Sequence, residues 1–585
     1  MNSASTTDSV VHALLSDRTI LNVGLTRSPF LFDFSVLQQF VVVCPSSLVS
    51  NWAKEFDKWI GRASQPKRVV IKKGGEEGLQ QIRAYFSSMK HQLMNQTGQV
   101  LIISYDLFRM HAAQFQDLNS TVGLLVVDEG HRLKNTAGSL TLTALESLQS
   151  DARLCITATP IQNNLSEFYN LVNFVCPGLL GDLNTFRRDY ERPIAASNNK
   201  NASSEQRSRG AAQSRALEET TKTFMLRRLQ KDILKSMLPP RTEALLFCRP
   251  SAEQSKLYRS ITSGSKSTGS FSDALTTLTT LRKVCSHPFL YKLDDGGPGG
   301  VGDPKAVLQS GKLAVLDSLL QSIRATAPND KVVIVSNFTS ALSIVESLVL
   351  DQRNYSHLRL DGTTDLQNRQ PLVDSFNRST PDKSFCLLLS SKAGGCGLNL
   401  IGANRLVMLD PDWNPANDVQ AMARIYREGQ TKPCTIYRLF TSGTVEEVIY
   451  QRQSQKGNLA TLTVDGRSGQ NTTGRFTKEE ISDCFTLKDC DCDTKRKLGS
   501  QWAVYDGSES LSLQGCVDEP LINVAESLSE TLAFVHIVDD DELAPLSVVD
   551  KEIDSASDNE SAASIAKGDT MKALYDSDSN DEFEF

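Results

Sequence analysis

Long apolar runs are missing from this chain of 585 residues. Charged residues break every hydrophobic stretch before the roughly 20 positions that a membrane-crossing helix needs, so we expect no membrane segment. The N-terminal residues MNSASTTDSVVHALLSDRTI lack a basic start followed by a long apolar run, which argues against a secretory signal. Hydrophobic and charged contents of 40% and 22% are ordinary for a water-soluble globular protein.

Cysteine pairs with a recognisable spacing are also missing. The 12 cysteines lie mostly singly and within apolar runs, which indicates reduced thiols of a cytosolic or nuclear protein and excludes a disulfide framework. Cys484, Cys490 and Cys492 lie close together, but no histidine follows nearby and a Cys-Asp-Cys spacing is too tight for a zinc hook. We predict free thiols there.

Positive charge is scarce at the C-terminal end. Asp539 to Phe585 contain 15 acidic residues, 3 lysines and no arginine, a net charge of −12, which leaves +5 for the rest of a chain whose total is −7. A mildly basic body permits nucleic-acid binding without proving it, because local clustering decides affinity. For the acidic, serine-rich end we predict a disordered, solvating tail, with a histone- or partner-binding segment as the alternative.

Apolar, β-branched runs recur along the chain with helical stretches between them. Near-continuous Val, Ile and Leu of this kind are typical of buried strands in parallel sheets. Because the runs form two sets, we predict an α/β fold with two doubly wound parallel-sheet lobes and helical insertions. The first set is 40–44, 100–104, 124–127 and 154–157; the second is 331–336, 358–360, 385–390, 405–409 and 435–439.

The regions around these sets indicate the domain boundaries. Residues 165–292 are mainly helical in pattern, with polar loops at 195–215 and 263–272, and the Gly/Pro-rich 294–303 forms a hinge. We predict an atypical N-terminal segment (1–37), a first lobe with a helical insertion (38–245), a helical insertion and hinge (246–305), a second lobe (306–465), a C-terminal extension (466–535) and an acidic disordered tail (536–585).

Two predicted strands of the first lobe end in polar residues. Asp128-Glu129 follows the strand LLVV, at the end of a parallel strand where ligands bind. Paired acids there suit nucleotide hydrolysis, one carboxylate holding Mg²⁺ and the next activating water, although a solvated turn explains the pair equally well. Thr157 and Thr159 end the next strand with hydroxyl groups suited to sensing a γ-phosphate; alone, Thr-Pro more often starts a helix.

The second lobe carries a stronger signal. Gly395 and Gly397 lie in LLLSSKAGGCGLNL (387–400), where glycines let backbone N–H groups approach a phosphate closely. Arg424 and Arg427, three residues apart, are expected on one helical face with Gln420 a turn earlier, an arrangement that suits arginine fingers acting on a phosphoryl group. A solvated basic helix face is the alternative. We favour the arginine fingers over this alternative, because the acid pair, the threonines and the glycines also occur along the chain in the order that fits a nucleotide site.

Together these motifs resemble those of the SWI/SNF-type DNA-dependent ATPases of helicase superfamily two. The resemblance covers roughly residues 38–460. Its segments are VVVCPSSLVSNW (41–52), LIISY (101–105), DEGHRLKN (128–135), TATPIQNNL (157–165), SNF (336–338), LRLDGTT (358–364), LSSKAGGCGLNL (389–400) and ARIYREGQ (423–430). DEGHRLKN, IYRLFTSGTVEEVIYQRQSQK (436–456) and FTKEEISDCFTL (476–487) are similar to the branch of Rad-fifty-four-like recombination-repair translocases.

The resemblance implies two RecA-like lobes and a role for each candidate residue. ATP and Mg²⁺ would be the cofactors, with Asp128 holding Mg²⁺, Glu129 acting as catalytic acid-base, and Arg424 and Arg427 acting as arginine fingers. Nucleotide contacts would come from Thr157, Thr159, Gly395, Gly397 and Gln420, and DNA contacts from Ser46, Ser47, Asn51, Ser390 and Ser391. The implied activity is ATP-driven movement along double-stranded DNA in the nucleus, remodelling chromatin and assisting a strand-exchange recombinase.

One expected motif is absent. The family opens its first lobe with a P-loop, yet no Gly-Lys-Ser or Gly-Lys-Thr occurs in the chain. Ser310-Gly311-Lys312-Leu313 is no substitute, because leucine follows the lysine and the segment lies at the entry to the second lobe. The runs 19–25 and 30–34 can fill a strand position but carry no phosphate-binding chemistry.

We therefore expect strong loss of ATP binding in this chain, and a truncated or mis-joined gene reading as its cause in preference to a natural pseudo-ATPase. The rival function is a two-lobed DNA- or chromatin-binding module that does not turn over ATP. An RNA helicase is a weaker alternative, because DEGHRLKN and Trp413-Asn414-Pro415 resemble the double-stranded-DNA motors.

Overall fold

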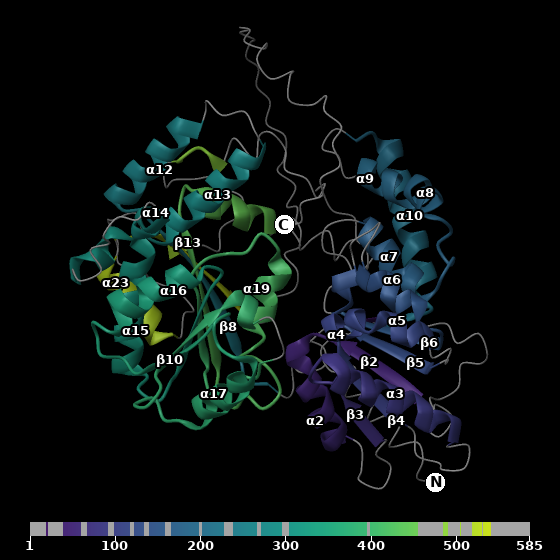
Figure 1. Cartoon of the computed structure of the whole chain (residues 1–585). Helices are drawn as coiled ribbons and strands as arrows, with labels where there is room; N and C mark the ends of the chain where they lie inside the picture. Colours follow the sequence, from purple (N-terminus) through teal and green to yellow (C-terminus); the bar gives the residue numbers. More distant parts are fainter. Residues whose placement is uncertain are drawn as a thin grey trace.

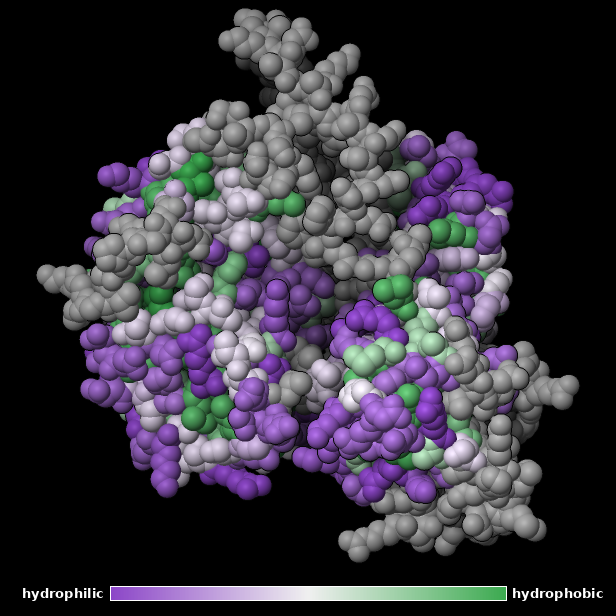
Figure 2. All heavy atoms as spheres, viewed as in Figure 1, coloured by the Kyte–Doolittle hydropathy of each residue, from purple (hydrophilic) through white to green (hydrophobic). Residues whose placement is uncertain are grey.

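The computed structural model forms two α/β lobes (Figure 1). It describes residues 19–21, 39–59, 67–91, 99–117, 122–133, 140–157, 165–197, 202–226, 238–265, 271–294, 304–394, 398–453, 484–488, 503–504, 518–528 and 530–539. Within these ranges no helix is both long and apolar enough to cross a membrane. Their surface is mainly hydrophilic on both lobes in the view of Figure 2.

The first lobe is built on a seven-stranded sheet in the order β3-β4-β2-β5-β6-β1-β7. Strands β3, β4, β2, β5 and β6 are parallel, whereas β1 pairs antiparallel with both β6 and β7. The strand bounds are β1 Thr19–Leu21, β2 Gln39–Cys44, β3 Lys67–Val70, β4 Gln99–Ser104, β5 Val122–Asp128, β6 Ser150–Thr157 and β7 Met225–Leu226. The central strands are apolar on both faces because helices cover both sides of the sheet.

Helices α2 (Val49–Trp59), α3 (Gly75–His91), α4 (Tyr105–Met110), α5 (Ala112–Asp117), α6 (Leu140–Ser147) and α7 (Leu165–Val175) surround this sheet. An insertion of α8 (Leu183–Phe186), the π-helical Arg187–Glu191, α9 (Arg192–Ser197) and α10 (Ser204–Lys222) follows. The predicted loop at 195–215 is wrong, because most of it belongs to α10. Ser203 and Gln206 form a capping box at its start, and at Gly210 an added Cβ would lie 2.2 Å from the Ser197 side chain, so α10 packs closely on α9.

The second lobe is built on an eight-stranded sheet in the order β10-β11-β9-β12-β13-β8-β15-β14. The strands β10 to β8 in this order are parallel, and β15 and β14 add antiparallel pairs at one edge. Their bounds are β8 Arg241–Cys248, β9 Val332–Ser336, β10 His357–Leu360, β11 Cys386–Ser390, β12 Arg405–Met408, β13 Cys434–Thr441, β14 Ala503–Val504 and β15 Leu532–Asp539. The prediction of two parallel-dominated α/β lobes is confirmed.

Two predicted boundaries need correction. The first lobe cannot extend to 245, because β8 pairs with β13 of the second sheet from Arg241 onward. Nor does the disordered tail begin at 536, because β15 pairs with β8 as far as Asp539. Both strands were missed because 165–292 was assigned to helices and because β15 pairs with a strand almost 300 positions earlier. Residues 503–504 and 518–539 are thus part of the second lobe.

Helices pack on this sheet and extend beyond one end of it (Figure 1). They are α12 (Ala252–Ser265), α13 (Phe271–Ser286), α14 (Phe289–Asp294), α15 (Gly311–Thr326), α16 (Thr339–Val345), the π-helical Glu346–Leu350, α17 (Leu366–Arg378), α18 (Ser391–Gly394), α19 (Pro415–Met422) and α23 (Glu519–Ser527). The face of α15 that packs on α23, β13 and β8 is mainly apolar, and Leu316, Leu319 and Ile323 are fully buried there.

Candidate functional site

The acid pair lies where two neighbouring parallel strands of the first lobe end. Asp128 is the last residue of β5 and pairs with Ile156 of β6, so Thr157 lies at the same edge. Asp128, Glu129 and Thr157 are buried, with 2%, 5% and 0% exposure. The structure therefore brings these three predicted residues together. Thr159 lies outside the described residues.

Each polar group of Asp128 has a protein partner. The indole Nε1 of Trp52 donates to Oδ2 at 2.9 Å, and the backbone N–H of Glu129 donates to Oδ1 at 2.9 Å. The hydroxyl of Tyr105 donates to the backbone oxygen at 2.5 Å. Each carboxylate oxygen keeps lone-pair capacity for a cation, because a carboxylate offers about four acceptor sites. The carboxylate is thus oriented from two neighbouring elements.

Glu129 occupies an unusual backbone conformation. Its φ of 55° lies in the left-handed region, which non-glycine residues adopt at a cost and which often marks a functional site. Its Oε2 lies 3.3 Å from Nδ1 of His131, so the imidazole faces this carboxylate. Between them, Gly130 has no space for a side chain, since an added Cβ would lie 2.0 Å from Sγ of Cys155.

Cys155 takes no chemical part in this site. Burial, reinforced by the nearby Asp128 and Glu129, raises the pKa of its thiol to about 12. It therefore stays protonated at neutral pH and acts as an apolar spacer beneath Gly130. Nucleophilic cysteine chemistry is excluded here.

The arginine pair lies beyond a helix, not on one. We predicted one helical face for Arg424 and Arg427, but α19 ends at Met422 and the following residues form turns. Hydrogen bonds from Arg424 N to Ala421 O (3.1 Å) and from Gln430 N to Arg427 O (3.0 Å) shape these turns. Gly429, at the end of these turns, has a φ of +97°, which glycine allows.

This arginine segment is docked on residues 398–400, which precede β12 and belong to no helix or strand. Leu400 N donates to Arg424 O at 3.0 Å, and Arg427 Nη1 donates to Leu398 O at 3.3 Å. Arg424 is 6% exposed, Arg427 is half-buried, and Gln420 is half-buried within α19. Gly395 and Gly397 lie outside the described residues.

A buried ladder of charges supports the same segment from the sheet. The Arg241 guanidinium lies 5.5 Å from the centre of the Tyr426 ring and donates to Glu243 at 3.0 Å. Glu243 accepts from Arg438 at 3.1 Å, and Arg438 donates to Asp418 of α19 at 3.1 Å. Sequence reasoning missed this ladder, since β8 was not recognised as a strand.

The residues expected on the DNA track differ in exposure. Ser46 and Asn51 are exposed at the start of the segment after β2, and Ser47 is half-buried. In the second lobe Ser391 is half-buried, whereas Ser390 is 4% exposed and its hydroxyl accepts from Ala393 N at 3.3 Å. Ser390 thus caps the start of α18.

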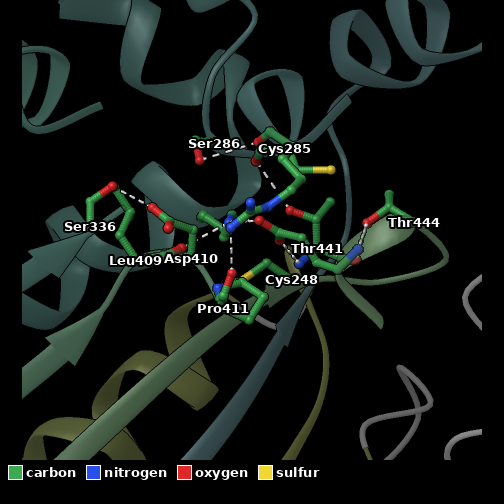
Figure 3. A network of polar contacts seen from close by, with 12 residues as sticks. Cys248, Cys285, Ser286, Ser336, Leu409, Asp410, Pro411, Thr441 and Thr444 are labelled. Carbon is green, nitrogen blue, oxygen red and sulfur yellow. Dashed lines mark hydrogen bonds and ion pairs between the residues drawn. The ribbon is translucent and has the colours of Figure 1, made fainter. Parts of the chain in front are cut away.

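Lys312 is not a phosphate-binding lysine. It is fully buried, and its Nζ donates to Glu446 Oε1 at 2.6 Å and to Leu409 O at 2.8 Å. Figure 3 shows the surrounding network at the ends of β12 and β13, where Thr441 N donates to Glu446 and Asp410 accepts from Ser336. The prediction that Ser310–Leu313 does not replace the P-loop is thereby supported by a structural role for the lysine.

ATP and Mg²⁺ fit this site only in part. Asp128 suits a cation, but across the described residues no group of three His, Cys, Asp or Glu side chains is arranged to hold a metal, so further ligands would have to come from phosphate oxygens. A phosphate cradle needs backbone N–H groups that follow a strand ending at this edge. The strand beside β6 is β1, with Thr19 opposite Thr157 and Leu21 opposite Cys155. β1 therefore runs away from the edge of the sheet at which Asp128 lies.

Comparisons with known proteins agree with the order of these elements. A family model described as "SNF2-related domain" matches residues 9–290, and one described as "Helicase conserved C-terminal domain" matches residues 311–429. Over 543 residues the chain is 40% identical to the DNA repair and recombination protein RAD54-like of Mus musculus, covering 85% of this chain and 70% of the relative.

Two further relatives give similar values. Identity is 41% over 472 residues with RAD54-like of Gallus gallus (77% of this chain, 63% of the relative). It is 39% over 498 residues with the DNA repair and recombination protein RAD54 of Saccharomyces cerevisiae (80% and 54%). The chain thus spans from about half to about two thirds of the length of these relatives.

Among solved structures, the chain is similar to the Sulfolobus solfataricus SWI2/SNF2 ATPase core in complex with dsDNA. Identity is 24%, the TM-score is 0.35, and the match covers 77% of this chain and 87% of that chain. A likeness this loose carries no argument about the arrangement of the lobes.

Proposed function

The chain belongs to the SNF2-related family, in the branch of the RAD54-like proteins, and on that premise we propose that it derives from an ATP-dependent translocase on double-stranded DNA. In this proposal it acts in the nucleus, in homologous-recombination repair of double-strand breaks. Its partners are duplex DNA, chromatin and nucleosomes, and a strand-exchange recombinase.

The observation that supports the proposal is that the chain has an acid pair at a strand end of the first lobe and an arginine pair in the second. Asp128 and Glu129 end a central strand of the first lobe, and Arg424 and Arg427 lie on a docked segment of the second. When bound, the nucleotide supplies the phosphoryl group to be transferred. Asp128 would be the protein ligand of Mg²⁺, Glu129 would take the proton of the attacking water, and the arginines would neutralise developing charge.

A second candidate is a DNA- or chromatin-binding protein without ATP turnover. Two observations favour it: no Gly-Lys-Ser or Gly-Lys-Thr occurs in the sequence, and β1 beside β6 runs in the direction that leads away from Asp128. A lysine and a hydroxyl at the phosphates account for much of the affinity of P-loop proteins for nucleotide, so their loss weakens binding strongly.

The test is ATP hydrolysis by the purified full chain, with and without duplex DNA, alongside DNA binding. Glu129→Gln removes the proposed base, and Glu146→Gln on the exposed side of α6 is the matched control. DNA-stimulated turnover that is lost only in Glu129→Gln supports the motor. DNA binding with no turnover in any variant supports the second candidate. Absence of DNA binding contradicts both.

A further inference from the structure

Trp52 connects the start of α2 to the candidate cation ligand. Its indole Nε1 donates to Asp128 Oδ2 at 2.9 Å across 76 positions of sequence. The ring is half-buried and packs against Phe56, with centroids 6.1 Å apart, and Phe56 in turn packs on Phe40 of β2 at 5.8 Å. The indole is therefore held by the core and is not a loosely placed surface donor.

This hydrogen bond links the side chain of Asp128 to α2. Its backbone is fixed at the end of β5 and by the Tyr105 hydroxyl, whose ring lies under the Arg132 guanidinium at 5.0 Å. Oδ1 accepts from the adjacent backbone N–H of Glu129, a local contact that moves with the residue itself. The Trp52 donor on Oδ2 comes from a different element, so it ties the orientation of the carboxylate to the position of α2.

The donor stands beside the surface where DNA contact is proposed. Asn51, the residue before Trp52, is exposed, and so is Ser46 in the turn of 3-10 helix that leads into α2. A ligand that shifts the start of α2 by a fraction of an ångström changes the length or angle of the hydrogen bond to Asp128, and hydrogen bonds weaken steeply with misalignment. The hydrogen bond of Trp52 is thus a contact through which a shift at the start of α2 reaches the Asp128 carboxylate.

We propose that Trp52 is a positioning residue that couples duplex-DNA contact at the start of α2 to the orientation of the Asp128 carboxylate. The proposal rests on the proposed function for the identity of the ligand, and on the contacts above for the coupling. It requires no ATP turnover, so it applies to a motor and to a non-hydrolysing DNA-binding protein alike.

The first test uses tryptophan fluorescence of the full chain during titration with duplex DNA. Trp52→Phe keeps an aromatic ring against Phe56 but removes the N–H donor. Trp59→Phe, two turns further along the same helix, is the matched control. We expect a DNA-dependent emission change in the wild type and in Trp59→Phe, and its loss in Trp52→Phe. An unchanged response in Trp52→Phe overturns the proposal.

The second test is a double-mutant cycle on DNA affinity with Trp52→Phe, Asp128→Ala and the double variant. Coupled residues give non-additive effects. We therefore expect Asp128→Ala to change the dissociation constant for DNA about fivefold or more when it is made in the wild type. The same substitution made in the Trp52→Phe variant should hardly change it. Additive effects reject the coupling. Because Asp128→Ala keeps the indole, it gives an independent answer even where Trp52→Phe lowers stability.

The outcomes separate this proposal from the proposed function. If the wild type binds duplex DNA but the emission response of Trp52→Phe equals that of Trp59→Phe, the coupling alone is contradicted. Wild-type chain that does not bind duplex DNA contradicts both. ATP hydrolysis, present or absent, changes neither conclusion about Trp52.

Discussion

Gly130 shows how one missing side chain shapes the candidate site. An added Cβ would lie 2.0 Å from Cys155 Sγ, well inside any real contact distance. Because this glycine holds Glu129 and His131 on either side of a tight turn, the whole acidic turn depends on it.

We predict that Gly130→Ala lowers the free energy of unfolding by about 1–3 kcal/mol, the usual cost of overpacking a core position. The measurement is urea unfolding. Cys155→Ala in the same chain should recover part of the loss, because it removes the clashing sulfur. Gly362→Ala is the control, since nothing lies within 4 Å of an added Cβ there. A loss of equal size at both glycines would contradict this account.

Lys312 is the clearest case of a residue whose surroundings decide its role. Its pair with Glu446 has 0% exposure on both sides. Lys312→Met should destabilise the second lobe by about 3–5 kcal/mol, because it leaves a buried carboxylate without its partner. Replacing both residues by apolar ones should cost less than the single change. Denaturant unfolding measures the difference.

The control for this prediction is Lys58→Met. Lys58 pairs with Glu428 at 3.2 Å, but the side chains are 50% and 54% exposed. Exposed pairs contribute about 0–1 kcal/mol, so this variant should unfold nearly as the wild type does. If Lys58→Met and Lys312→Met lowered the free energy of unfolding equally, burial would not be the reason why the Lys312 pair contributes to stability.

At the scale of single residues, sequence patterns locate strand ends well and long-range hydrogen bonds poorly. Asp128 and Thr157 were each predicted at the end of an apolar strand, and the register brings these two strand ends to the same edge of the sheet. The Trp52 donor was not predicted. Its partner is 76 positions away, and nothing in the periodicity of α2 indicates which acceptor its indole reaches.

Among the elements, α19 carries a titratable group that links the arginine segment to pH. Burial raises the pKa of Asp418 from 3.8 to about 7, against the opposing effect of Arg438. Asp412 N and Gln453 of the neighbouring segments also donate to this carboxylate, and Glu243 lies beyond Arg438 in the ladder.

This raised pKa fixes the sign of a pH effect. The folded state holds a proton on Asp418 that the unfolded state has released, so the stabilisation is complete below pH 3.8 and is lost as the pH rises through about 7. We predict that the unfolding free energy of the wild type falls more steeply from pH 5 to pH 8 than that of Asp418→Asn, which cannot titrate. Denaturant unfolding at several pH values measures both slopes. Asp351→Asn, at an exposed position, should follow the wild type.

Helices and strands were predicted correctly where hydrophobic runs are continuous. The prediction failed where the local sequence does not show which element a segment forms. The strands β2, β4, β5, β9 and β11 fall on the predicted runs because each is buried on both faces. In contrast, the Arg- and Gln-rich α10 was taken for a loop, since its polar composition conceals good helix formers and a capping box.

For the whole molecule, the C-terminal strands are the least expected feature. β15 covers the edge of β8, and Phe534 stacks on Phe247 with ring centroids 4.0 Å apart. Asp518, at the start of α23, accepts from Arg405 at 2.7 Å. Local composition gives little sign of this, because the long pairing of β15 is with β8, far away in sequence, and its pairing with β14 involves two residues of that strand.

Two truncations test the importance of this edge. A chain ending at residue 502 loses β14, α23 and β15, exposes the β8 edge, and should melt at a lower temperature and aggregate. A chain ending at Asp539 loses only the residues after β15 and should melt as the full chain does. Circular dichroism with light scattering distinguishes them. Equal melting of the two truncated chains would show that the second lobe does not need these strands.

The direction of β1 limits what single substitutions can do at this edge of the sheet. A point substitution changes a side chain but leaves β1 running from Thr19, opposite Thr157, to Leu21, opposite Cys155. Glycine, lysine or threonine introduced one at a time into β1 therefore does not turn this strand toward Asp128. A phosphate loop beside β6 calls instead for the exchange of a whole strand, its loop and the helix that follows.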